Sequence, residues 1–416
     1  MVNGCLSIQC GKSSMFSLEQ FINQHVTMRD SSMFLPDIEK NRKILEEKIE
    51  GKRVCVIGGA GSIGSSFIKA ILAFKPSTLV VVDINENALA ELTRDLRSTK
   101  DMYIPEDYIT YPMDFASPVF EKMYKKRGGF DIVANFSAHK HVRSEKDIYS
   151  VESLLQNNVL HAKILLDLLA KYPPEEFFCV STDKAANPVN IMGASKRIME
   201  DVIFSYSDIF PVKTARFANV AFSNGSLPAG FLDRIKKHQP LSAPSDVKRY
   251  FVSPEESGQI CMLACILGEN RTILFPKLKE AQMMTFDAIG TRLLEEHGYE
   301  VLECDSDEEA INKAENLKNG SRLYPVHYTV SDTSGEKPFE EFVTDSETTD
   351  MEVFESLGII TGKVIPNKER IKQLLSRLND VFEKDEVTKE EVVNIIKEYL
   401  PCFEHIETGK SLDSKM

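Results

Sequence analysis

The sequence predicts an α/β fold of the Rossmann type, in which helices cover both faces of a doubly wound parallel sheet. Between residues 50 and 280, short apolar runs rich in β-branched residues alternate with helical segments. A glycine-rich turn directly follows the first apolar run, and an aspartate ends the second. Buried parallel strands are continuous apolar runs, and strands alternating with helices favour a doubly wound sheet. We expect this domain to carry a smaller substrate-binding region and a C-terminal appendage.

The expected elements follow in order from the N-terminus. Residues 1–49 are expected to form a helical arm, because apolar residues recur at helical spacing among charged ones from residue 17 onward. KRVCVIGGAGSIGSSFIKAILAF then predicts strand, turn and helix, TLVVVDIN a second strand and ENALAELTRDLRS a second helix. FDIVANFSA and EFFCVSTDK are further strands on either side of the helical stretch LLQNNVLHAKILLDLLAKY. Residues 50–280 are therefore expected to form the Rossmann domain, with substrate-side elements interleaved.

The chain changes character after about residue 280. Residues 281–416 begin with a strongly acidic stretch and continue through a polar, turn-rich one. Two helices are expected at the end, and Thr388 and Glu391 open the second of them with the spacing of a capping box. We expect this C-terminal extension, α/β or helical, to complete the substrate side.

Composition and charge exclude several classes of protein. The 416 residues are 42% hydrophobic, which is enough for a large core, and the net charge of −13 without a basic run argues against nucleic acid or an anionic membrane as partner. No apolar run reaches the ~18 residues of a spanning helix and the N-terminus lacks a secretory pattern, so we expect a cytoplasmic protein. The eight cysteines form no Cys-x-x-Cys pair and no histidine or carboxylate cluster accompanies them, so no metal site is expected.

The glycine turn indicates a dinucleotide site. Gly58, Gly61 and Gly64 follow a strand and open a helix, and Ser62 and Ile63 lie between them. Glycine at these positions lets the backbone turn sharply and lets a pyrophosphate approach the main-chain N–H groups at the start of the helix. The glycine pattern carries meaning only in this strand–turn–helix context, which the sequence supplies.

An acidic residue in the expected place strengthens the dinucleotide hypothesis. Asp83 ends the next strand, where a carboxylate would accept hydrogen bonds from the hydroxyls of the adenosine ribose. A 2′-phosphate would be repelled there, so the pattern favours NAD over NADP. Asp114, after the third apparent strand, is either an adenine neighbour or a turn residue.

Polar residues follow two later strands. The strand FDIVANFSA is followed by residues that either contact the cofactor and substrate or are polar surface: Ala138, His139, Lys140 and His141. Asn157 and Asn158 either pass beneath the nicotinamide or pack as structural amides. The strand EFFCV leads into STDKAANPVNIMGASKR, which places Asp183 and Lys184 side by side at a strand end, an arrangement that is either an acid/base pair or a solvated ion pair.

These motifs together resemble the extended short-chain dehydrogenase/reductase family. Within it, the chain resembles the polysaccharide-biosynthesis branch, the nucleotide-sugar 4,6-dehydratases acting on UDP-N-acetylglucosamine. The resemblance covers residues 50 to about 275, and its most specific pieces are GGAGSIGS, STDKAANPVNIMGASKR, ARFANVAFSNGS and RYFVSPEES. Met192 stands four residues before Lys196, where the family pattern Tyr-x-x-x-Lys has tyrosine, and a methionine there is typical of the members that retain configuration at C5.

The resemblance implies a role for each residue of the catalytic segment. Asp183 would protonate the leaving C6 hydroxyl, and Lys184, as a neutral amine, would take the C5 proton. Thr182 would hydrogen-bond the C4 oxygen. Lys196 would hold the nicotinamide ribose and place a positive charge near the developing alkoxide. The group that takes the C4 hydroxyl proton is left open, because the thioether of Met192 cannot move a proton.

The resemblance also implies a substrate side. Arg216 and Asn219 would lie near the nicotinamide, and the stretch from Ser223 through Asn224 to Ser226 near the diphosphate. We expect Arg249 to contact a diphosphate or ribose, because a guanidinium offers two parallel donors to phosphate oxygens.

The resemblance further implies NAD as the cofactor and an early step in bacterial surface glycan or glycoprotein sugar synthesis. A homo-oligomer is expected through the helices that start near Val151 and Ala194. The open alternatives are a GDP-linked sugar as substrate, a C5-inverting dehydratase, a nucleotide-sugar 4-epimerase and a non-catalytic dinucleotide sensor. Met192 argues against the inverting enzyme, and the Asp183 and Lys184 pair argues against the epimerase and the sensor.

Overall fold

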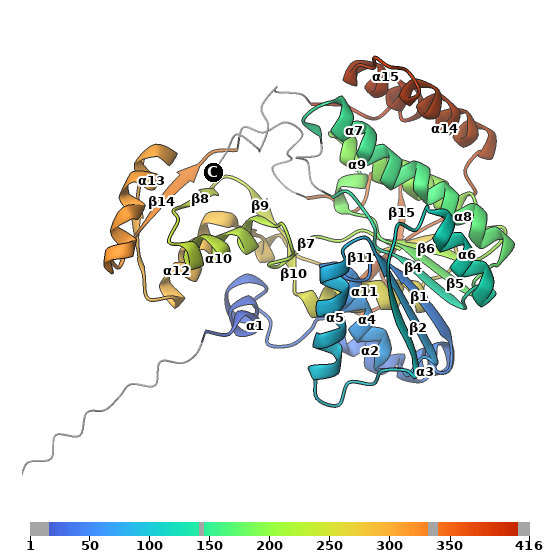
Figure 1. The fold of residues 1–416 in the computed structure, drawn as a ribbon, viewed down its shortest axis with the longest axis horizontal. Coiled ribbons are helices and arrows are strands. Elements are labelled where there is room, and N and C mark those ends of the chain that lie inside the picture. The colour runs from blue at the N-terminus through green and yellow to red at the C-terminus, as the bar shows by residue number, and fades with distance from the viewer. Residues whose placement is uncertain (1–15, 141–144, 332–339, 407–416) are drawn as a thin grey trace, which may run out of the picture.

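The computed structural model describes residues 16–140, 145–331 and 340–406. Its centre is a nine-stranded sheet with the order β15-β16-β11-β6-β5-β4-β1-β2-β3 (Figure 1). All neighbours from β11 to β3 pair in parallel, whereas β16 and β15 are antiparallel additions at one edge. The strands are β1 (Arg53–Ile57), β2 (Thr78–Asp83), β3 (Asp107–Pro112), β4 (Ile132–Asn135), β5 (Glu176–Cys179), β6 (Val212–Ala215), β11 (Thr272–Pro276), β15 (Thr348–Asp350) and β16 (Leu357–Thr361).

Helices cover both faces of this sheet, so the predicted Rossmann-type architecture is confirmed. The alternating side chains of β1 and β2 divide between two apolar cores, one on each face. One face is covered by α3 (Arg42–Ile49), α4 (Ser62–Leu72), α5 (Glu86–Ser98) and α11 (Pro254–Leu267). The other face is covered by α6 (Pro118–Arg127), α7 (Ile148–Leu155), α8 (His161–Lys171) and α9 (Ile191–Phe204).

A smaller region with its own apolar core lies beside the carboxyl ends of the strands (Figure 1). Its three strands pair in parallel in the order β13-β14-β8, and helices pack on them. Two further short strand pairs belong to neither of these sheets. The elements are β7 (Asn219–Val220), α10 (Leu227–Lys237), β8 (Leu241–Pro244), β9 (Lys248–Arg249), β10 (Phe251–Val252), β12 (Met284–Thr285), α12 (Phe286–Glu296), β13 (Glu300–Glu303), α13 (Asp307–Ala314) and β14 (Leu323–Thr329).

The described part of the N-terminal arm joins two of the cores. Helix α1 (Leu18–Phe21) and the π-helical turn that follows it pack in the smaller region, whereas α2 (Leu35–Lys40) and α3 pack beneath the main sheet. The buried carboxylate of Asp37 accepts hydrogen bonds from the backbone N–H groups of Glu355 and Ser356, at 2.7 and 2.8 Å. The arm is therefore tied to the segment that enters β16.

The C-terminal hairpin of α14 (Lys368–Phe382) and α15 (Lys389–Tyr399) packs on the outer side of α7 and α9 (Figure 1). Thr388 and Glu391 form the predicted capping box at the start of α15, so that expectation is confirmed. The Tyr399 hydroxyl donates to Asp201 of α9 at 3.0 Å. As a result every residue of α9 is buried except Arg197 and Asp201, which are partly buried.

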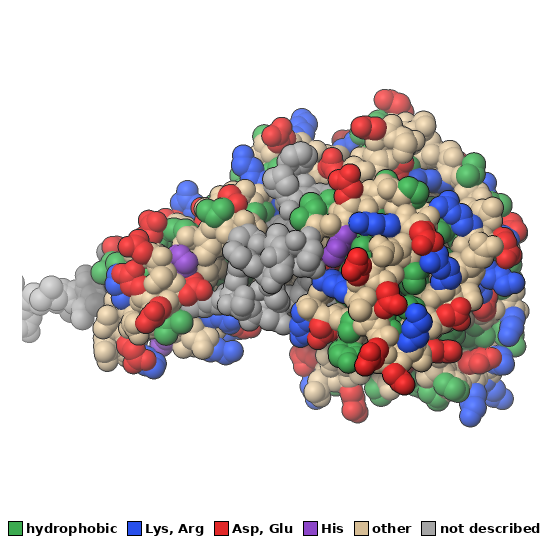
Figure 2. All heavy atoms as spheres, turned by 90° about the horizontal axis from the view of Figure 1, so that it is seen from above, with side chains coloured by type: hydrophobic (Ala, Val, Ile, Leu, Met, Phe, Trp, Pro, Cys, Tyr) green, Lys and Arg blue, Asp and Glu red, His purple; other side chains and the backbone are tan. Residues whose placement is uncertain are grey.

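Charged side chains of both signs are interspersed over the face of the molecule shown in Figure 2. The described residues of this face form no continuous basic patch. Within the three described ranges, no helix combines the length and apolar character that crossing a membrane requires.

Candidate active site

A large cavity opens at the carboxyl ends of β1, β2, β4 and β5, between the main sheet and the smaller region. Its volume is about 990 Å³, at the upper end of the range for ligand pockets in proteins. Ligands of open parallel sheets bind at this edge, because the loops after the strands converge there. Most of the residues that the sequence analysis selected line this cavity.

The glycine turn forms one end of the cavity. Gly58 has φ +69°, and a Cβ at this position would lie 2.6 Å from the backbone nitrogen of Ser137. A Cβ on Gly64 would lie 2.3 Å from the carbonyl oxygen of Gly58. Helix α4 begins after Gly61 with no side-chain cap, so its first N–H groups have no side-chain acceptor. Because these groups and the helix dipole favour an anion, the turn fits the pyrophosphate of a dinucleotide. Ser62 and Ile63 line the cavity with the three glycines.

Asp83 lies beside this turn at the end of β2 and lines the cavity. Its carboxylate accepts hydrogen bonds from the backbone N–H groups of Ala60 and Asn85, at 3.1 and 3.0 Å. Its predicted contact with a ribose stays a prediction. Asp114 is exposed and outside the cavity lining, and its carboxylate accepts the Ala116 N–H in a local turn.

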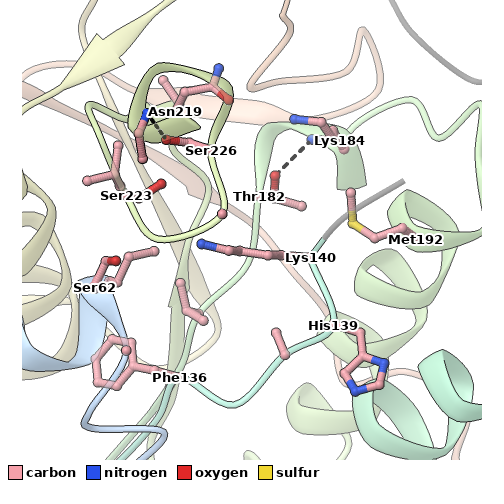
Figure 3. A pocket seen from close by; sticks show the side chains of 18 of the residues that line it. Ser62, Phe136, His139, Lys140, Thr182, Lys184, Met192, Asn219, Ser223 and Ser226 are labelled. Carbon is pink, nitrogen blue, oxygen red and sulfur yellow. Dashed lines mark hydrogen bonds between the residues drawn. The ribbon is translucent and has the colours of Figure 1, made fainter. Parts of the chain in front are cut away.

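The segment after β4 forms the floor of the cavity. Ala138, His139 and Lys140 line it, whereas His141 lies outside the described residues. Burial, and secondarily the neighbouring His161, lower the pKa of His139. Removal of Lys140 from bulk water between the cavity walls lowers its pKa, and Figure 3 shows its side chain crossing the middle of the cavity.

Two neighbouring asparagines have different surroundings, and a contact of either with a nicotinamide stays a prediction. Asn157 lines the cavity. Asn158 is buried and holds the backbone of His139, accepting from its N–H at 2.9 Å and donating to its carbonyl at 3.0 Å. Its amide also donates to Ser195 of α9 at 3.0 Å, so Asn158 fixes the floor segment to the helix behind it.

The segment after β5 brings the acid/base residues together. The Thr182 hydroxyl donates to Oδ1 of Asp183 at 2.7 Å, and Nζ of Lys184 lies 3.5 Å from the same oxygen. The Lys184 backbone N–H donates to Thr182 Oγ1 at 3.4 Å (Figure 3). Asp183 is almost completely buried, whereas the Lys184 side chain is 29% exposed. One carboxylate is thus shared by a hydroxyl and an amine, and all three residues line the cavity.

Helix α9 supplies Met192 and Lys196 to the same cavity. Figure 3 shows the Met192 thioether on the side of the cavity that also carries Thr182 and Lys184. Lys196 is buried, and its ammonium donates to the carbonyl oxygen of Val180 at 3.0 Å. Burial lowers the pKa of Lys196.

Arg216 does not line the cavity, although the resemblance placed it near the nicotinamide. It is fully buried and holds two carboxylates, with 2.7 Å between Nη2 and Oε2 of Glu200 and 2.8 Å between Nη1 and Oε2 of Glu347. The Ser181 hydroxyl donates to Glu200 at 2.6 Å. Arg216 therefore connects the end of β5 to the C-terminal segment.

The substrate-side residues lie across the cavity from the acid/base residues (Figure 3). Asn219, Ser223 and Arg249 line the cavity. Asn224 does not, but its backbone N–H donates to the Ser62 hydroxyl at 2.9 Å and so ties this loop to α4. Ser226 is the N-cap of α10, whose first turn also lines the cavity.

The structure adds cavity residues that sequence reasoning missed. Arg234 of α10 lines the cavity. The smaller region contributes Ser242, Thr329 and Ser331 to the cavity lining. Glu340 is a buried carboxyl at the cavity wall, and no local pattern marks it in a polar, turn-rich stretch. The part of the chain that the structure describes holds no cluster of three or more His, Cys, Asp or Glu suited to a metal ion.

Comparisons with known proteins agree with this architecture. The model of a family described as polysaccharide biosynthesis protein matches residues 54–361. The chain is 28% identical to an uncharacterized membrane protein of Methanocaldococcus jannaschii, over 83% of this chain and 96% of that protein. It is 27% identical to a UDP-glucose 4-epimerase of Rickettsia canadensis, over 80% and 98% of the two chains. It is 26% identical to the inverting UDP-N-acetylglucosamine 4,6-dehydratase of Campylobacter jejuni, over 55% and 67%.

Longer relatives and solved structures complete the comparison. The chain spans 49% of a probable polysaccharide biosynthesis protein of Bacillus subtilis and 55% of a capsular polysaccharide biosynthesis protein of Staphylococcus aureus. The protein Pen of Bacillus thuringiensis has a similar structure, with a TM-score of 0.61 and 18% identity over 80% of this chain and 98% of that chain. A dTDP-glucose 4,6-dehydratase of Streptomyces venezuelae, solved with NAD, gives a TM-score of 0.52 at 19% identity over 70% and 88%. At these identities the solved structures support the fold.

Proposed function

The chain belongs to the polysaccharide biosynthesis protein family, and from this premise we propose that it is an NAD-dependent nucleotide-sugar 4,6-dehydratase. The proposed substrate is UDP-N-acetylglucosamine, and the product is the UDP-linked 4-keto-6-deoxy sugar with its C5 configuration retained. The observation that carries the proposal is the cluster of Thr182, Asp183 and Lys184 in the same cavity as the glycine turn. Chemistry confined to C4 needs no such acid/base pair, whereas loss of water across C5 and C6 needs both members.

The cofactor end of the cavity supports NAD as the proposed cofactor. The turn from Gly58 to Gly64 and the open start of α4 would hold the pyrophosphate. Asp83 would hold the adenosine ribose and Lys196 the nicotinamide ribose. When bound, NAD would supply the hydride acceptor for C4 and return the same hydride to C6.

The remaining steps are proton transfers that this chain's residues would perform. The C4 hydroxyl would hydrogen-bond Thr182, whose own proton points to Asp183 at 2.7 Å, so the C4 proton can pass through Thr182 to the carboxylate. Lys184, as the free amine, would take the C5 proton that the new C4 ketone acidifies. Protonated Asp183 would then give its proton to the C6 hydroxyl, which leaves as water. Lys184 would return a proton to C5 as hydride reaches C6, so proton gains and losses balance.

The decisive experiment follows the product in deuterated water. Purified protein would be incubated with UDP-N-acetylglucosamine and NAD, and the product examined by NMR. We expect a 4-keto-6-deoxy sugar with deuterium at C5, because Lys184 exchanges with solvent, and with the C4 hydrogen retained at C6. A GDP-linked sugar in a parallel reaction would test the nucleobase. Inverted C5 configuration would assign the chain to the inverting dehydratases, against the expectation from Met192.

A nucleotide-sugar 4-epimerase is the second candidate, favoured by the relative of Rickettsia canadensis that aligns over 98% of its length. An epimerase would return the C4 epimer with its C6 hydroxyl intact and without deuterium at C5. A protein that binds NAD but converts neither sugar would support the non-catalytic dinucleotide sensor. The same NMR spectrum therefore separates all three functions.

A further inference from the structure

Glu340 is a buried carboxyl on the cavity wall that the proposed mechanism does not use. Its side chain is 3% exposed, and it enters the cavity from the C-terminal part of the chain. Asn219 Nδ2 donates to Oε1 at 2.5 Å, and the backbone N–H of Tyr250 donates to Oε2 at 2.8 Å. The guanidinium of Arg249 lies beside the same carboxyl, with Nε 3.8 Å from Oε1. Two N–H donors and a cation surround the group, and this arrangement fits a carboxylate.

The side-chain amide of Asn219 has one orientation beside this carboxylate. An amide group has a donating end and an accepting end, whereas a carboxylate can only accept hydrogen bonds. Glu340 therefore takes the Nδ2 end of Asn219. The backbone of Asn219 is held as well, because its N–H donates to the Tyr250 carbonyl at 3.2 Å beside the pairing of β7 with β10. The carbonyl oxygen Oδ1 is the end of the amide that remains.

This carbonyl oxygen is open to a ligand. Asn219 is partly exposed and lines the cavity, and no donor among the described residues makes a hydrogen bond to its Oδ1. The diphosphate oxygens of a nucleotide sugar carry no proton at neutral pH and cannot donate to Oδ1, whereas a sugar hydroxyl or an amide N–H can. Asn219 is thus suited to a donor group of the ligand and not to its diphosphate.

The place of Asn219 indicates which donor it would meet. It lies across the cavity from Thr182 and Lys184 (Figure 3). These two residues are proposed to act on the edge of the sugar that carries C4, C5 and C6. The opposite edge of the ring, with a hydroxyl at C3 and an amide N–H at C2, would then face Asn219.

We propose that Glu340 is a positioning residue that turns the Asn219 amide, so that Oδ1 accepts a hydrogen bond from the C3 hydroxyl or the C2 amide N–H of the bound sugar. The inference rests on the proposed function, because the orientation of the sugar follows from the acid/base cluster. Glu340 acts through Asn219. Neither residue gains or loses a proton in the reaction, so its proton balance is unchanged.

Glu340→Gln should reverse the amide of Asn219. The Tyr250 N–H belongs to the backbone and cannot turn, so it keeps the carbonyl oxygen of the new glutamine as its acceptor. The glutamine NH2 group then faces Asn219, whose amide has to turn Oδ1 toward it and Nδ2 toward the cavity. A donor would meet a donor when the sugar binds, so we expect the sugar to bind about tenfold more weakly, roughly the worth of one hydrogen bond.

Calorimetry with three ligands would measure this effect. The sugar probe is the UDP-linked 6-deoxy form of N-acetylglucosamine, which keeps the donors at C2 and C3 and has no C6 hydroxyl to lose. The probe and UDP are titrated into protein saturated with NADH, which cannot accept a hydride, and NAD is titrated into the free protein. UDP lacks the sugar and NAD binds at the other end of the cavity, so their affinities should stay within about twofold of the wild type. Burial and then the charge of Asp183 raise the pKa of Glu340 to about 8. The titrations are therefore made at pH 9, where its carboxylate predominates.

A second substitution separates this role from a structural one. In the double variant Glu340→Gln with Asn219→Asp, one oxygen of the new aspartate accepts from the glutamine NH2 and the other faces the sugar. This variant should bind the probe within about threefold of the wild type, although Asn219→Asp alone places two carboxylates against each other and should weaken the probe. Glu341→Gln is the matched control, because Glu341 binds Asn187 outside the cavity lining. It should bind all three ligands as the wild type does.

The outcomes separate the inference from the proposed function. Unchanged binding of the probe by Glu340→Gln would overturn the inference, because glutamine would match a protonated Glu340 that donates to Asn219. Equal weakening of the probe and UDP without rescue in the double variant would reduce Glu340 to a structural role. Weakening of NAD alone would place Asn219 at the nicotinamide and would also overturn the inference. If the wild type forms no 4-keto-6-deoxy sugar but the selective loss and the rescue are observed, the dehydratase reaction is wrong and the role of Glu340 stands.

Discussion

Two walls of the cavity are built in different ways. The strand-end wall comprises the cavity residues of 58–64, 83–84, 137–140 and 180–184, which end or follow β1, β2, β4 and β5. The far wall comprises the cavity residues of 219–249, 329–331 and 340, which belong to the smaller region and the C-terminal part of the chain. Neighbouring parallel strands position the first wall through their own register, whereas contacts between distant segments position the second.

The difference teaches where the site is rigid and where it depends on tertiary contacts. On the strand-end wall, the end of each strand is fixed by the ladder of backbone hydrogen bonds beside it. On the far wall, Glu340 reaches the cavity because the segment that follows it is held by Arg216, which donates to the carbonyl of Phe342 at 3.0 Å and to Glu347. The far wall should therefore be the part that a single distant substitution can displace.

The largest expected effect is on stability, at the anchor of the far wall. Glu347→Gln should reduce the free energy of unfolding by about 3 kcal/mol. This value is at the low end for breaking a buried ion pair, because Arg216 retains its ion pair with Glu200. Despite burial, the hydrogen bonds and charge of Arg216, aided by Lys363, lower the pKa of Glu347 to about 2. The stabilisation by ionised Glu347 is thus present above pH 4.5 and is lost as the pH falls toward 2. The difference in the free energy of unfolding between the wild type and Glu347→Gln should therefore shrink in acid.

Urea denaturation at pH 7 and in acid would measure this effect. Glu352→Gln, at an exposed position of the same part of the chain, is the control and should leave stability within about 0.5 kcal/mol of the wild type. An equal loss of stability from both variants would mean that Glu347 is no anchor.

How much of each wall the sequence could predict follows from the same difference. The glycine turn, Asp83 and the cluster of Thr182, Asp183 and Lys184 lie at strand ends, and strand ends are visible as apolar runs. Parallel strands bring their carboxyl ends to one edge, so local patterns were enough to place these residues together. Asp114 shows that a position after an apolar run is not sufficient evidence for a place in the cavity. It lies outside the cavity lining, and its carboxylate accepts a hydrogen bond from the Ala116 N–H in a local turn.

The far wall could not be predicted in this way. Glu340 reaches Asn219 across 121 positions of the chain, and Arg216 meets Glu347 across 131. A single sequence carries no signal for such pairings, because neither periodicity nor a turn motif links the partners. For the same reason, the sequence did not indicate that α14 and α15 enclose α9, the helix that the resemblance assigned to a subunit interface.

The next effect concerns catalysis on the strand-end wall. Asp183→Asn and Lys184→Ala should each lower kcat about a hundredfold or more, the usual worth of a positioned acid or base. NAD binding measured by calorimetry should be unchanged, because neither residue is proposed to hold the cofactor. Normal turnover by both variants would reduce the pair to a structural role and remove the argument for a dehydratase.

A smaller effect is expected at the cofactor end of the same wall. Asp83→Ala should weaken NAD about tenfold, the worth of a hydrogen bond to a charged group, and should weaken NADP less. Asp83 also accepts the Ala60 N–H of the glycine turn, so Asp83→Asn separates this contact from the charge. The asparagine variant should keep the turn and lose the discrimination against NADP. Equal losses for both cofactors in calorimetric titrations would mean that Asp83 does not face the ribose.

The smallest effect is expected at Met192. Met192 lies on the strand-end side of the cavity, and its thioether carries no proton. If the C4 proton passes through Thr182 to Asp183, Met192→Ala and Met192→Tyr should both keep kcat within about threefold of the wild type. A true acid or base would be worth about a hundredfold.

The same relay predicts a loss of activity at Thr182. Thr182→Val should lower kcat, because it removes the hydroxyl that donates to Asp183 at 2.7 Å, whereas Thr182→Ser should keep the activity because it keeps that hydroxyl. If Met192→Tyr instead raised kcat more than tenfold, the wild-type site would lack a proton acceptor that tyrosine supplies. The relay through Thr182 would then be wrong.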